Sequence, residues 1–265
     1  MKRLIYQVYI PIRGSSNLYD FCTESVAQYC KKYGFDHIIQ REAKLKIKPD
    51  MARTDRNKNG LLKETGGYLV IYEKENAFDL LNDYDQIAIV DSDIYIRESA
   101  PNIFEELGTE FDFGGVLERD LPLSTQHRGK IKGYSRDMFT NLKDVDWKWN
   151  NDGAEFMNMG IMVMNHSLAK YLNGQTAKEF LERKEFKDFV DGVGYLRFST
   201  DQVLLNYWLK KCGAKVKHMD WAWNTLYRGA EDSYIPKAHF IHFFLKDHLP
   251  GKGENVKDIK NILGI

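Results

Sequence analysis

Two carboxylates, Asp91 and Asp93, stand inside residues 86–96, where β-branched and apolar side chains predict a strand covered on both faces. An unpaired buried carboxylate is very costly, so a core strand has no reason of its own to finish on two acids. In an extended chain, residues two apart point the same way, which aims both carboxylates at one point. This suits a hard divalent cation with open positions for a phosphate-bearing substrate. A solvated turn is the alternative, because Asp and Ser favour turns.

A second set of polar residues lies in the methionine-rich apolar run 156–165. The methionines are most simply core filler. Asn158 and Gly160 are harder to explain as core, since a buried Asn needs hydrogen-bond partners and a strand Gly often marks close approach of a ligand or another backbone. Further on, Thr176-x-x-Glu179 and Ser199-x-x-Gln202 each have the pattern of a capping box that opens a helix.

The composition excludes several classes of protein. The chain has 265 residues, 43% hydrophobic and 29% charged, and its net charge is zero, so nothing in the totals indicates binding to nucleic acid or an anionic membrane. Cys22 and Cys30 lie eight residues apart on a predicted helix, about 12 Å along its axis, which is too far for a disulfide. The N-terminus lacks the pattern of a signal peptide and no apolar run spans a membrane, so we expect a cytoplasmic protein.

The elements that position these residues follow an α/β pattern. Residues 4–10 predict a strand, residues 18–29 a helix that ends at Gly34, and residues 35–40 a second strand. This βαβ opening predicts a parallel sheet with ligands at the carboxyl ends of its strands. Ile10 and the turn-like loop after it, residues 13–17, are therefore a candidate site for a nucleotide base. Helix-capping and turn residues explain that loop equally well.

Later segments continue the pattern. We expect helices at 73–82 and from 99 to Gly108, with Pro101 in the first turn, and strands at 111–116, 156–165, 214–219 and 238–243. Residues 41–66 are expected to be an exposed excursion, and 120–150 a long, poorly periodic loop, which is usually functional or mobile. The sequence predicts a single domain, residues 1–265, with a mostly parallel central sheet flanked by helices.

Together, four segments resemble the glycosyltransferases of the Rossmann-like GT-A fold, most closely the group of glycogenin and the lipopolysaccharide galactosyltransferases. The resemblance covers roughly residues 68–245. It departs from the family pattern where Met157 separates Phe156 from Asn158. The segments are Lys74, seventeen positions before Asp91-Ser92-Asp93; Phe156-x-Asn158-x-Gly160 with Asn165; Ser199-Thr200-Asp201-Gln202 with Asn206; and the strand 239–243 with its two histidines.

The resemblance implies a role for each segment. The metal would be Mn²⁺ or Mg²⁺, with a histidine as the third ligand, and mixed carboxylate and imidazole ligands suit Mn²⁺. Asn158 would bond sugar hydroxyls and Gly160 would let the backbone come close. Plain helix capping is the alternative for Asp201 and Gln202, which would otherwise face the reacting sugar. The implied metal ligands are Asp91, Asp93 and His242, with His239 as the alternative; Lys74 and Ser92 would lie at the donor.

The implied reaction transfers a sugar from a nucleotide-diphosphate donor, with UDP favoured, to a glycan or other hydroxyl acceptor with retention of configuration. No residue is an evident covalent nucleophile, so attack on the same face, assisted by the leaving phosphate, is the default mechanism. The carboxylates to test are Asp152, Glu155 and Asp201. Aromatic residues in 120–150, Trp147 and Trp149, and residues 221–224 are candidate walls for the acceptor, although Trp is more often a core residue.

The chain departs from the family after its histidine. The family pattern H-x-x-G-x-x-K-P-W, a lid whose lysine holds the diphosphate, is absent, and Lys246 or Lys252 is the candidate replacement. A domain that binds nucleotide sugar or carbohydrate without turnover is therefore an alternative hypothesis. A phosphatase with an aspartyl nucleophile is another, but its motif usually lies on the first strand and continues to Thr or Val, where this chain has Tyr95.

Overall fold

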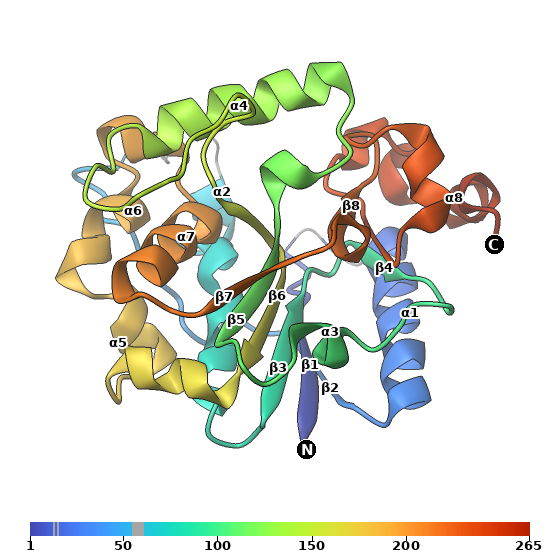
Figure 1. Ribbon diagram of the computed structural model, residues 1–265, viewed down its shortest axis with the longest axis horizontal. Helices are drawn as coiled ribbons and strands as arrows, with labels where there is room; N and C mark the ends of the chain where they lie inside the picture. Colours follow the sequence, from blue (N-terminus) through green and yellow to red (C-terminus); the bar gives the residue numbers. More distant parts are fainter. Residues whose placement is uncertain (13, 15, 55–60) are drawn as a thin grey trace.

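The computed structural model describes residues 1–12, 14, 16–54 and 61–265, and its main sheet is mostly parallel. The strand β6 runs antiparallel to its neighbours β3 and β5, while the other three adjacent pairs are parallel. This confirms the predicted mostly parallel sheet (Figure 1). In spatial order the strands are β2 Asp36–Gln40, β1 Arg3–Val8, β3 Gln86–Val90, β6 Met157–Asn165, β5 Phe113–Leu117 and β7 Val216–Met219.

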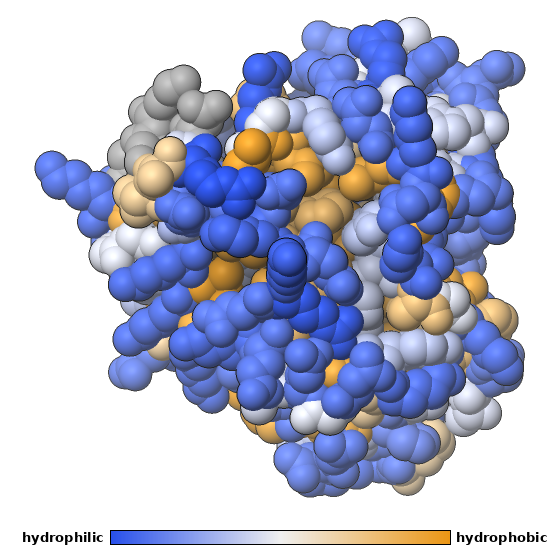
Figure 2. All heavy atoms as spheres, turned by 90° about the vertical axis from the view of Figure 1, so that its left-hand side faces the viewer, coloured by the Kyte–Doolittle hydropathy of each residue, from blue (hydrophilic) through white to orange (hydrophobic). Residues whose placement is uncertain are grey.

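Helices cover both faces of this sheet, as predicted, because alternate strand residues point to opposite sides. Leu4 packs in the cluster that includes α7 (Asp201–Cys212) and α5 (Ala177–Leu181), whereas Ile5 packs with α1 (Asn17–Tyr33) and α3 (Ile103–Leu107). Figure 1 shows α1 and α3 on one side and α5 and α7 on the other. On the face shown in Figure 2, apolar side chains gather in a hollow within a largely hydrophilic surface.

A second, three-stranded sheet follows from a turn inside residues 86–96, which we expected to be one strand. The strand β3 ends at Val90, and the chain turns where Asp91 O accepts a hydrogen bond from Ile94 N at 3.1 Å. The chain then forms β4 (Ile94–Ile96), which pairs with β9 (Phe240–His242), and β9 pairs with β8 (Thr225–Leu226). A turn and a cation site were the two alternatives that the sequence analysis gave for Asp91 and Asp93. The structure has the turn, and the turn is compatible with a cation site.

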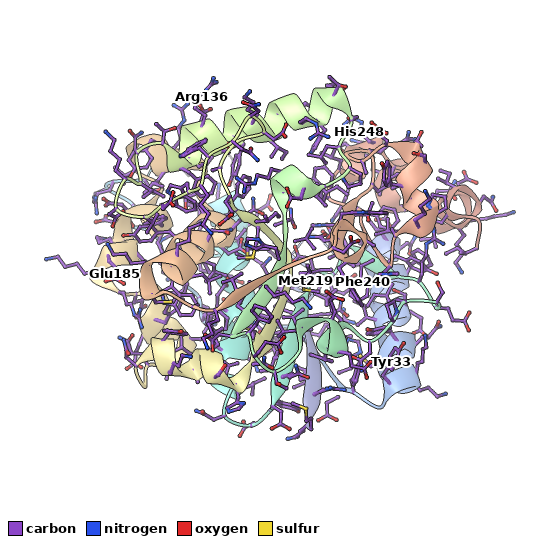
Figure 3. All side chains as sticks on the ribbon, in the orientation of Figure 1. Tyr33, Arg136, Glu185, Met219, Phe240 and His248 are labelled. Carbon is purple, nitrogen blue, oxygen red and sulfur yellow. The ribbon has the colours of Figure 1, made fainter. Side chains whose placement is uncertain are left out.

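The prediction of a long loop over residues 120–150 is wrong, because Thr125–Phe139 forms the helix α4. Ser124 caps it by accepting from His127 N at 3.3 Å. Few of its side chains are buried, so the apolar periodicity that predicts a helix is weak. This helix lies across the carboxyl end of the sheet (Figure 1), and its Arg136 projects outward while Met219 and Phe240 lie inside the molecule (Figure 3). The other α-helices of the described residues are α2 Leu61–Glu64, α6 Lys187–Asp191 and α8 Val256–Leu263.

Three predicted helix starts need correction. The helix expected at 73–82 is a 3-10 helix, η3 (Lys74–Leu80), and α3 begins after Asn102, whose side chain caps it, rather than near Pro101. The cap of α7 is Thr200, which accepts from Gln202 N, so the pattern that begins at Ser199 was placed one residue early. The capping box of Thr176 and Glu179 is confirmed.

The segment 41–66 is less exposed than expected. Leu45 and Ile47 are buried, and the buried carboxylate of Glu73 accepts hydrogen bonds from the backbone N–H groups of residues 44, 45 and 46 at 2.7–3.1 Å. Alternation lets the apolar side chains pack while the lysines face solvent. Residues 55–60 of this prediction lie outside the described residues. In the part of the chain that is described, no helix has the length and apolar composition needed to cross a membrane.

Candidate active site

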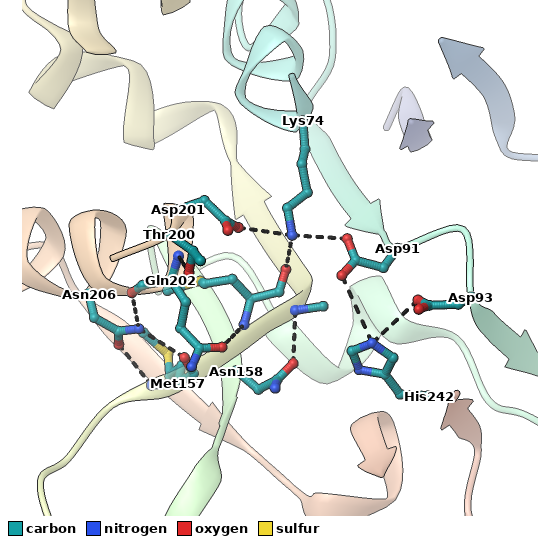
Figure 4. Close-up of polar contacts among 12 residues, drawn as sticks. Lys74, Asp91, Asp93, Met157, Asn158, Thr200, Asp201, Gln202, Asn206 and His242 are labelled. Carbon is teal, nitrogen blue, oxygen red and sulfur yellow. Dashed lines mark hydrogen bonds and ion pairs between the residues drawn. The ribbon is translucent and has the colours of Figure 1, made fainter. Parts of the chain in front are cut away.

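Asp91, Asp93 and His242 meet at the carboxyl end of the main sheet. Each offers a ligand atom, and these atoms lie within 4.8 Å of one another. His242 Nε2 lies 3.3 Å from Asp93 Oδ1 and 4.0 Å from Asp91 Oδ2 (Figure 4). The pairing of β4 with β9 explains the meeting, because Ile94 is opposite His242 and Phe243 N donates to Asp93 O at 2.9 Å. The arrangement can therefore hold one cation between two distant segments.

The charges of this cluster depend on one another. Burial raises the pKa of Asp91 above its ordinary value, although Lys74 opposes the shift. For Asp93, burial also favours a higher pKa, but the neighbouring His242 outweighs it and lowers the pKa. For His242, burial favours a lower pKa, and Asp93 outweighs it and raises the pKa. Asp93 and His242 therefore each favour the charged form of the other.

Lys74 lies beside this cluster, at the start of η3. Its Nζ lies 2.9 Å from Asp91 Oδ1, 2.9 Å from Asp201 Oδ2, and donates to Met159 O at 2.8 Å (Figure 4). Burial favours a lower pKa for Lys74, but Asp201 and Asp91 outweigh it and raise the pKa above its ordinary value. Gln202 Oε1 accepts from Met159 N at 3.2 Å. The structure therefore brings Lys74 to Asp201 and Gln202, which lie in a distant segment of the chain.

A cavity of about 410 Å³ opens onto these groups. The Ser92 hydroxyl faces inward and donates to Val8 O at 2.9 Å, so it supports the turn. Two tyrosines that the sequence analysis missed complete the wall, Tyr9 and Tyr19, and the Arg41 guanidinium lies 4.3 Å from the Tyr9 ring centroid. The available signal for Tyr9 was its place beside the candidate Ile10, at the end of the predicted first strand. The cavity is lined by Val8, Tyr9, Ile10, Ile12, Tyr19, Val70, Ile71, Lys74, Asp91, Ser92, Asp93 and Asp201.

The two candidate lid lysines lie in different surroundings. Lys246 Nζ is 3.4 Å from the ring centroid of Tyr19 and hydrogen-bonds its hydroxyl, and burial lowers the pKa of Lys246. Lys252 is exposed and lies 3.5 Å from the equally exposed Asp247. Only Lys246 contacts a residue of the cavity wall. In the predicted base loop, residues 13 and 15 lie outside the described part of the chain.

Asn158 and Gly160 face the protein rather than the cavity. The Asn158 amide accepts from Gly160 N at 2.9 Å and donates to Glu118 Oε1 at 2.6 Å, and Asn158 is only 8% exposed. A Cβ added to Gly160 would lie 2.5 Å from His242 Cε1, so the glycine makes room for the imidazole. Glu118 was missed as a site residue. Its place at the carboxyl end of a strand in a parallel sheet was the signal that could have found it.

Asp152 and Glu155 lie away from the cluster. Glu155 pairs with Lys210 at 2.8 Å and Arg119 at 3.2 Å and lines a separate cavity of about 350 Å³ beside β7, while Asp152 lies 3.5 Å from Arg128. Among the candidate acceptor walls, Trp147 and Trp223 are buried and Trp149 is 46% exposed. His239 packs against Trp223, with 5.0 Å between ring centroids. The sequence alone gave no reason to exclude these residues from the site.

Comparison with known proteins gives structural likeness without sequence likeness. Neither the family models nor the curated proteins contain a match to the chain. A glycosyltransferase involved in glycosylation of the major capsid of PBCV-1 superposes with a TM-score of 0.54 at 10% identity, over 97% of this chain and 100% of that one. Two others have TM-scores too low to establish a shared fold. They are mouse xyloside xylosyltransferase 1 (0.44, 12% identity, 94% and 99% covered) and galactosyltransferase LgtC with donor and acceptor sugar analogs (0.47, 14%, 98% and 95%).

These findings agree with the sequence motifs on the architecture. The mostly parallel sheet, with helices on both faces and the Asp-Ser-Asp turn at its carboxyl end, is the arrangement expected of the GT-A fold. The chain therefore has the fold of a GT-A glycosyltransferase.

Proposed function

We propose that this protein is a metal-dependent glycosyltransferase that moves a sugar from a nucleotide-diphosphate sugar to a hydroxyl acceptor. The observation that carries the proposal is the convergence of Asp91, Asp93 and His242 within 4.8 Å, at the edge of a cavity of about 410 Å³. A ligand in that cavity would meet the cation site and Lys74 together. The fold shared with a known glycosyltransferase supports this reading, and we propose that residues 1–265 act as one domain.

The donor atoms fit a divalent metal ion. Two carboxylates and one imidazole suit Mn²⁺, and Mg²⁺ is the alternative. A bound cation would neutralise the charge that develops on the leaving diphosphate. The protein adds fixed positive charge of its own, because the buried Lys74 ammonium is already held by three oxygen atoms and needs little reorganisation. We propose that Lys246 is the second positively charged side chain at the diphosphate, since it contacts Tyr19 on the cavity wall.

The position of the reacting sugar follows from the same contacts. Asp201 lines the cavity and pairs with Lys74, so we place the sugar of the donor beside Asp201 and Gln202 at the start of α7. We propose retention of configuration, by attack on the same face with assistance from the leaving phosphate. Asp152 and Glu155 take no part in this proposal because their partners are cations elsewhere on the molecule. UDP as the nucleotide remains a proposal from the motif resemblance.

The test is Mn²⁺-dependent release of nucleotide from a panel of UDP-, GDP- and other nucleotide sugars, with and without EDTA. One donor should be hydrolysed or transferred, EDTA should stop the reaction, and the double variant Asp91→Asn/Asp93→Asn should be inactive. The variant Asp152→Asn is the matched control, since it neutralises a carboxylate outside the cavity. Donor binding without turnover across a broad acceptor panel would instead indicate a non-catalytic binding domain. No binding and no turnover with any donor would overturn the proposal.

A further inference from the structure

We propose that Glu118, Asn158 and Asn224 form a hydrogen-bond relay that fixes the orientation and tautomer of His242. The three are positioning residues that present Nε2 of His242, and not Nδ1, to the cation site. The inference rests on the proposed metal site, but the relay itself is defined by contacts within the protein. Its members come from four elements, because Glu118 follows β5, Asn158 lies in β6, Asn224 ends the 3-10 helix η8 (Trp221–Asn224) and His242 ends β9.

The assignment starts from one backbone amide. Gly160 N lies 2.9 Å from the Asn158 side-chain atom assigned as Oδ1. A backbone N–H can only donate, so this atom must be the oxygen and the amide of Asn158 cannot be flipped. The other end, Nδ2, then faces Glu118 Oε1 at 2.6 Å, where a carboxyl oxygen accepts the hydrogen bond.

The same argument applies to the side-chain amide of Asn224. Asn224 lies 2.8 Å from Asn158 Oδ1, and since that oxygen only accepts, the Asn224 atom facing it must be the donor Nδ2. The oxygen of Asn224 therefore faces Nδ1 of His242 at 3.1 Å. An amide oxygen only accepts, so Nδ1 carries a hydrogen. The carboxylate oxygen of Asp93, 3.3 Å from Nε2, also only accepts, so without a cation Nε2 carries a hydrogen too. A bound cation would take the place of that hydrogen and meet the lone pair of Nε2, while Nδ1 keeps its hydrogen bond to Asn224.

Burial makes the relay rigid. Glu118 is 3% exposed, Asn224 0% and His242 6%, so solvent does not compete for these bonds. Gly160 closes the remaining side, because a Cβ there would lie 2.7 Å from His242 Nδ1 and 2.9 Å from Asn158 Oδ1. Hydrogen-bond partners behind a metal-binding histidine fix its tautomer and ring orientation, and their loss typically costs about 10–100-fold in metal affinity.

The first test examines Nδ1 of His242 without any metal. In ¹⁵N-histidine-labelled protein free of metal, NMR should show a proton on Nδ1 that exchanges slowly with water, with the signal assigned by its absence in His242→Gln. In Asn224→Leu, the Nδ1 proton should exchange rapidly or be lost. An Nδ1 without a proton in the unaltered protein would overturn the inference, and this result does not depend on donor or activity.

The second test measures Mn²⁺ binding by electron paramagnetic resonance in the absence of donor. Asn224→Leu and Glu118→Leu should bind Mn²⁺ about 10–100-fold more weakly, and Glu118→Gln, which keeps an acceptor oxygen, should lose less. The matched control is Asn165→Ala, which removes a buried Asn at the far end of β6, where it donates to Gly108 O and Phe111 O.

The two tests separate the relay from the proposed function. Unchanged Mn²⁺ affinity in Asn224→Leu, in a protein that otherwise binds Mn²⁺, would overturn the relay and leave the metal site standing. Failure of the unaltered protein to bind Mn²⁺ would overturn the metal site, and the proton on Nδ1 of His242 would then decide the relay by itself.

Discussion

The Lys74 ammonium lies 2.9 Å from the Asp201 carboxylate and so joins the first turn of α7 to the 3-10 helix that precedes β3. Both side chains are almost fully buried, with 13% and 8% exposed. The same Nζ is 2.9 Å from Asp91, so Lys74 is paired both with Asp201 on the cavity wall and with Asp91 of the candidate metal site. Its removal therefore has consequences for stability and for donor binding.

Lys74→Met should lower both stability and activity, because it leaves Asp91 and Asp201 without their cation. Breaking a buried ion pair by removing one partner costs on the order of 3–5 kcal/mol. Urea unfolding should show a loss of that order, and kcat/KM for the donor should fall at least about 100-fold. The double variant Lys74→Met/Asp201→Asn should regain part of the stability and none of the activity. Unfolding and kinetics unchanged in Lys74→Met would contradict the role given to this residue.

Gly160→Ala should weaken Mn²⁺ binding by about tenfold or more, because the new Cβ would lie 2.5 Å from the His242 ring and must displace it. Gly129→Ala is the matched control. A Cβ at Gly129, inside α4, would have nothing within 4 Å, so the change should leave Mn²⁺ binding unaltered and stabilise the helix by about 1 kcal/mol. Calorimetric titration with Mn²⁺ and thermal unfolding measure the two effects. Equal Mn²⁺ affinity in the two variants would be inconsistent with the packing described.

Lys246→Ala should raise KM for the donor at least about tenfold, since a hydrogen bond from a charged group to phosphate contributes about 1.5–3 kcal/mol. Lys252→Ala removes the same charge from an exposed site and should leave KM within about twofold. Steady-state kinetics with the donor found in the panel above distinguishes the two lysines. A larger effect at Lys252 would show that it is the lysine that replaces the family lid residue.

Asp112 should give the protein a pH-dependent share of its stability. Burial favours a higher pKa, but hydrogen bonds from Ser167, Lys215 N and others outweigh it and lower the pKa from 3.8 to about 2. A lowered pKa in the folded state contributes stability that is complete above about pH 4 and is lost as the pH falls through about 2. At pH 7, Asp112→Asn should be less stable by about 2 kcal/mol.

The measurement for Asp112 is urea unfolding of both proteins between pH 7 and pH 2. The difference between them should shrink as the pH falls below 4. A difference that stays constant over this range would show that the carboxylate charge is not what stabilises the contacts of Asp112.

Local patterns in the sequence predicted much of the fold. Alternating and periodic apolar residues located the strands of the main sheet and the helices α1 and α7, and Gly34 and Gly213 end these two helices in the left-handed conformation, which glycine adopts at little cost. The polar helix α4 could not be found in this way, because its buried face is short and two glycines interrupt it. Its helical state depends on contacts with the rest of the molecule.

The sequence alone also predicted a cation at the candidate site, since Asp-Ser-Asp after an apolar strand indicates one. It left His239 and His242 as alternatives. Only the tertiary structure shows which of the two lies beside the carboxylates: the pairing of β9 with β4 brings His242 to Asp93, whereas His239, which precedes β9, packs against Trp223. It also decided the use of Asn158, whose amide is occupied by Glu118 and Asn224. Such contacts join residues far apart in the chain, and no local pattern encodes them.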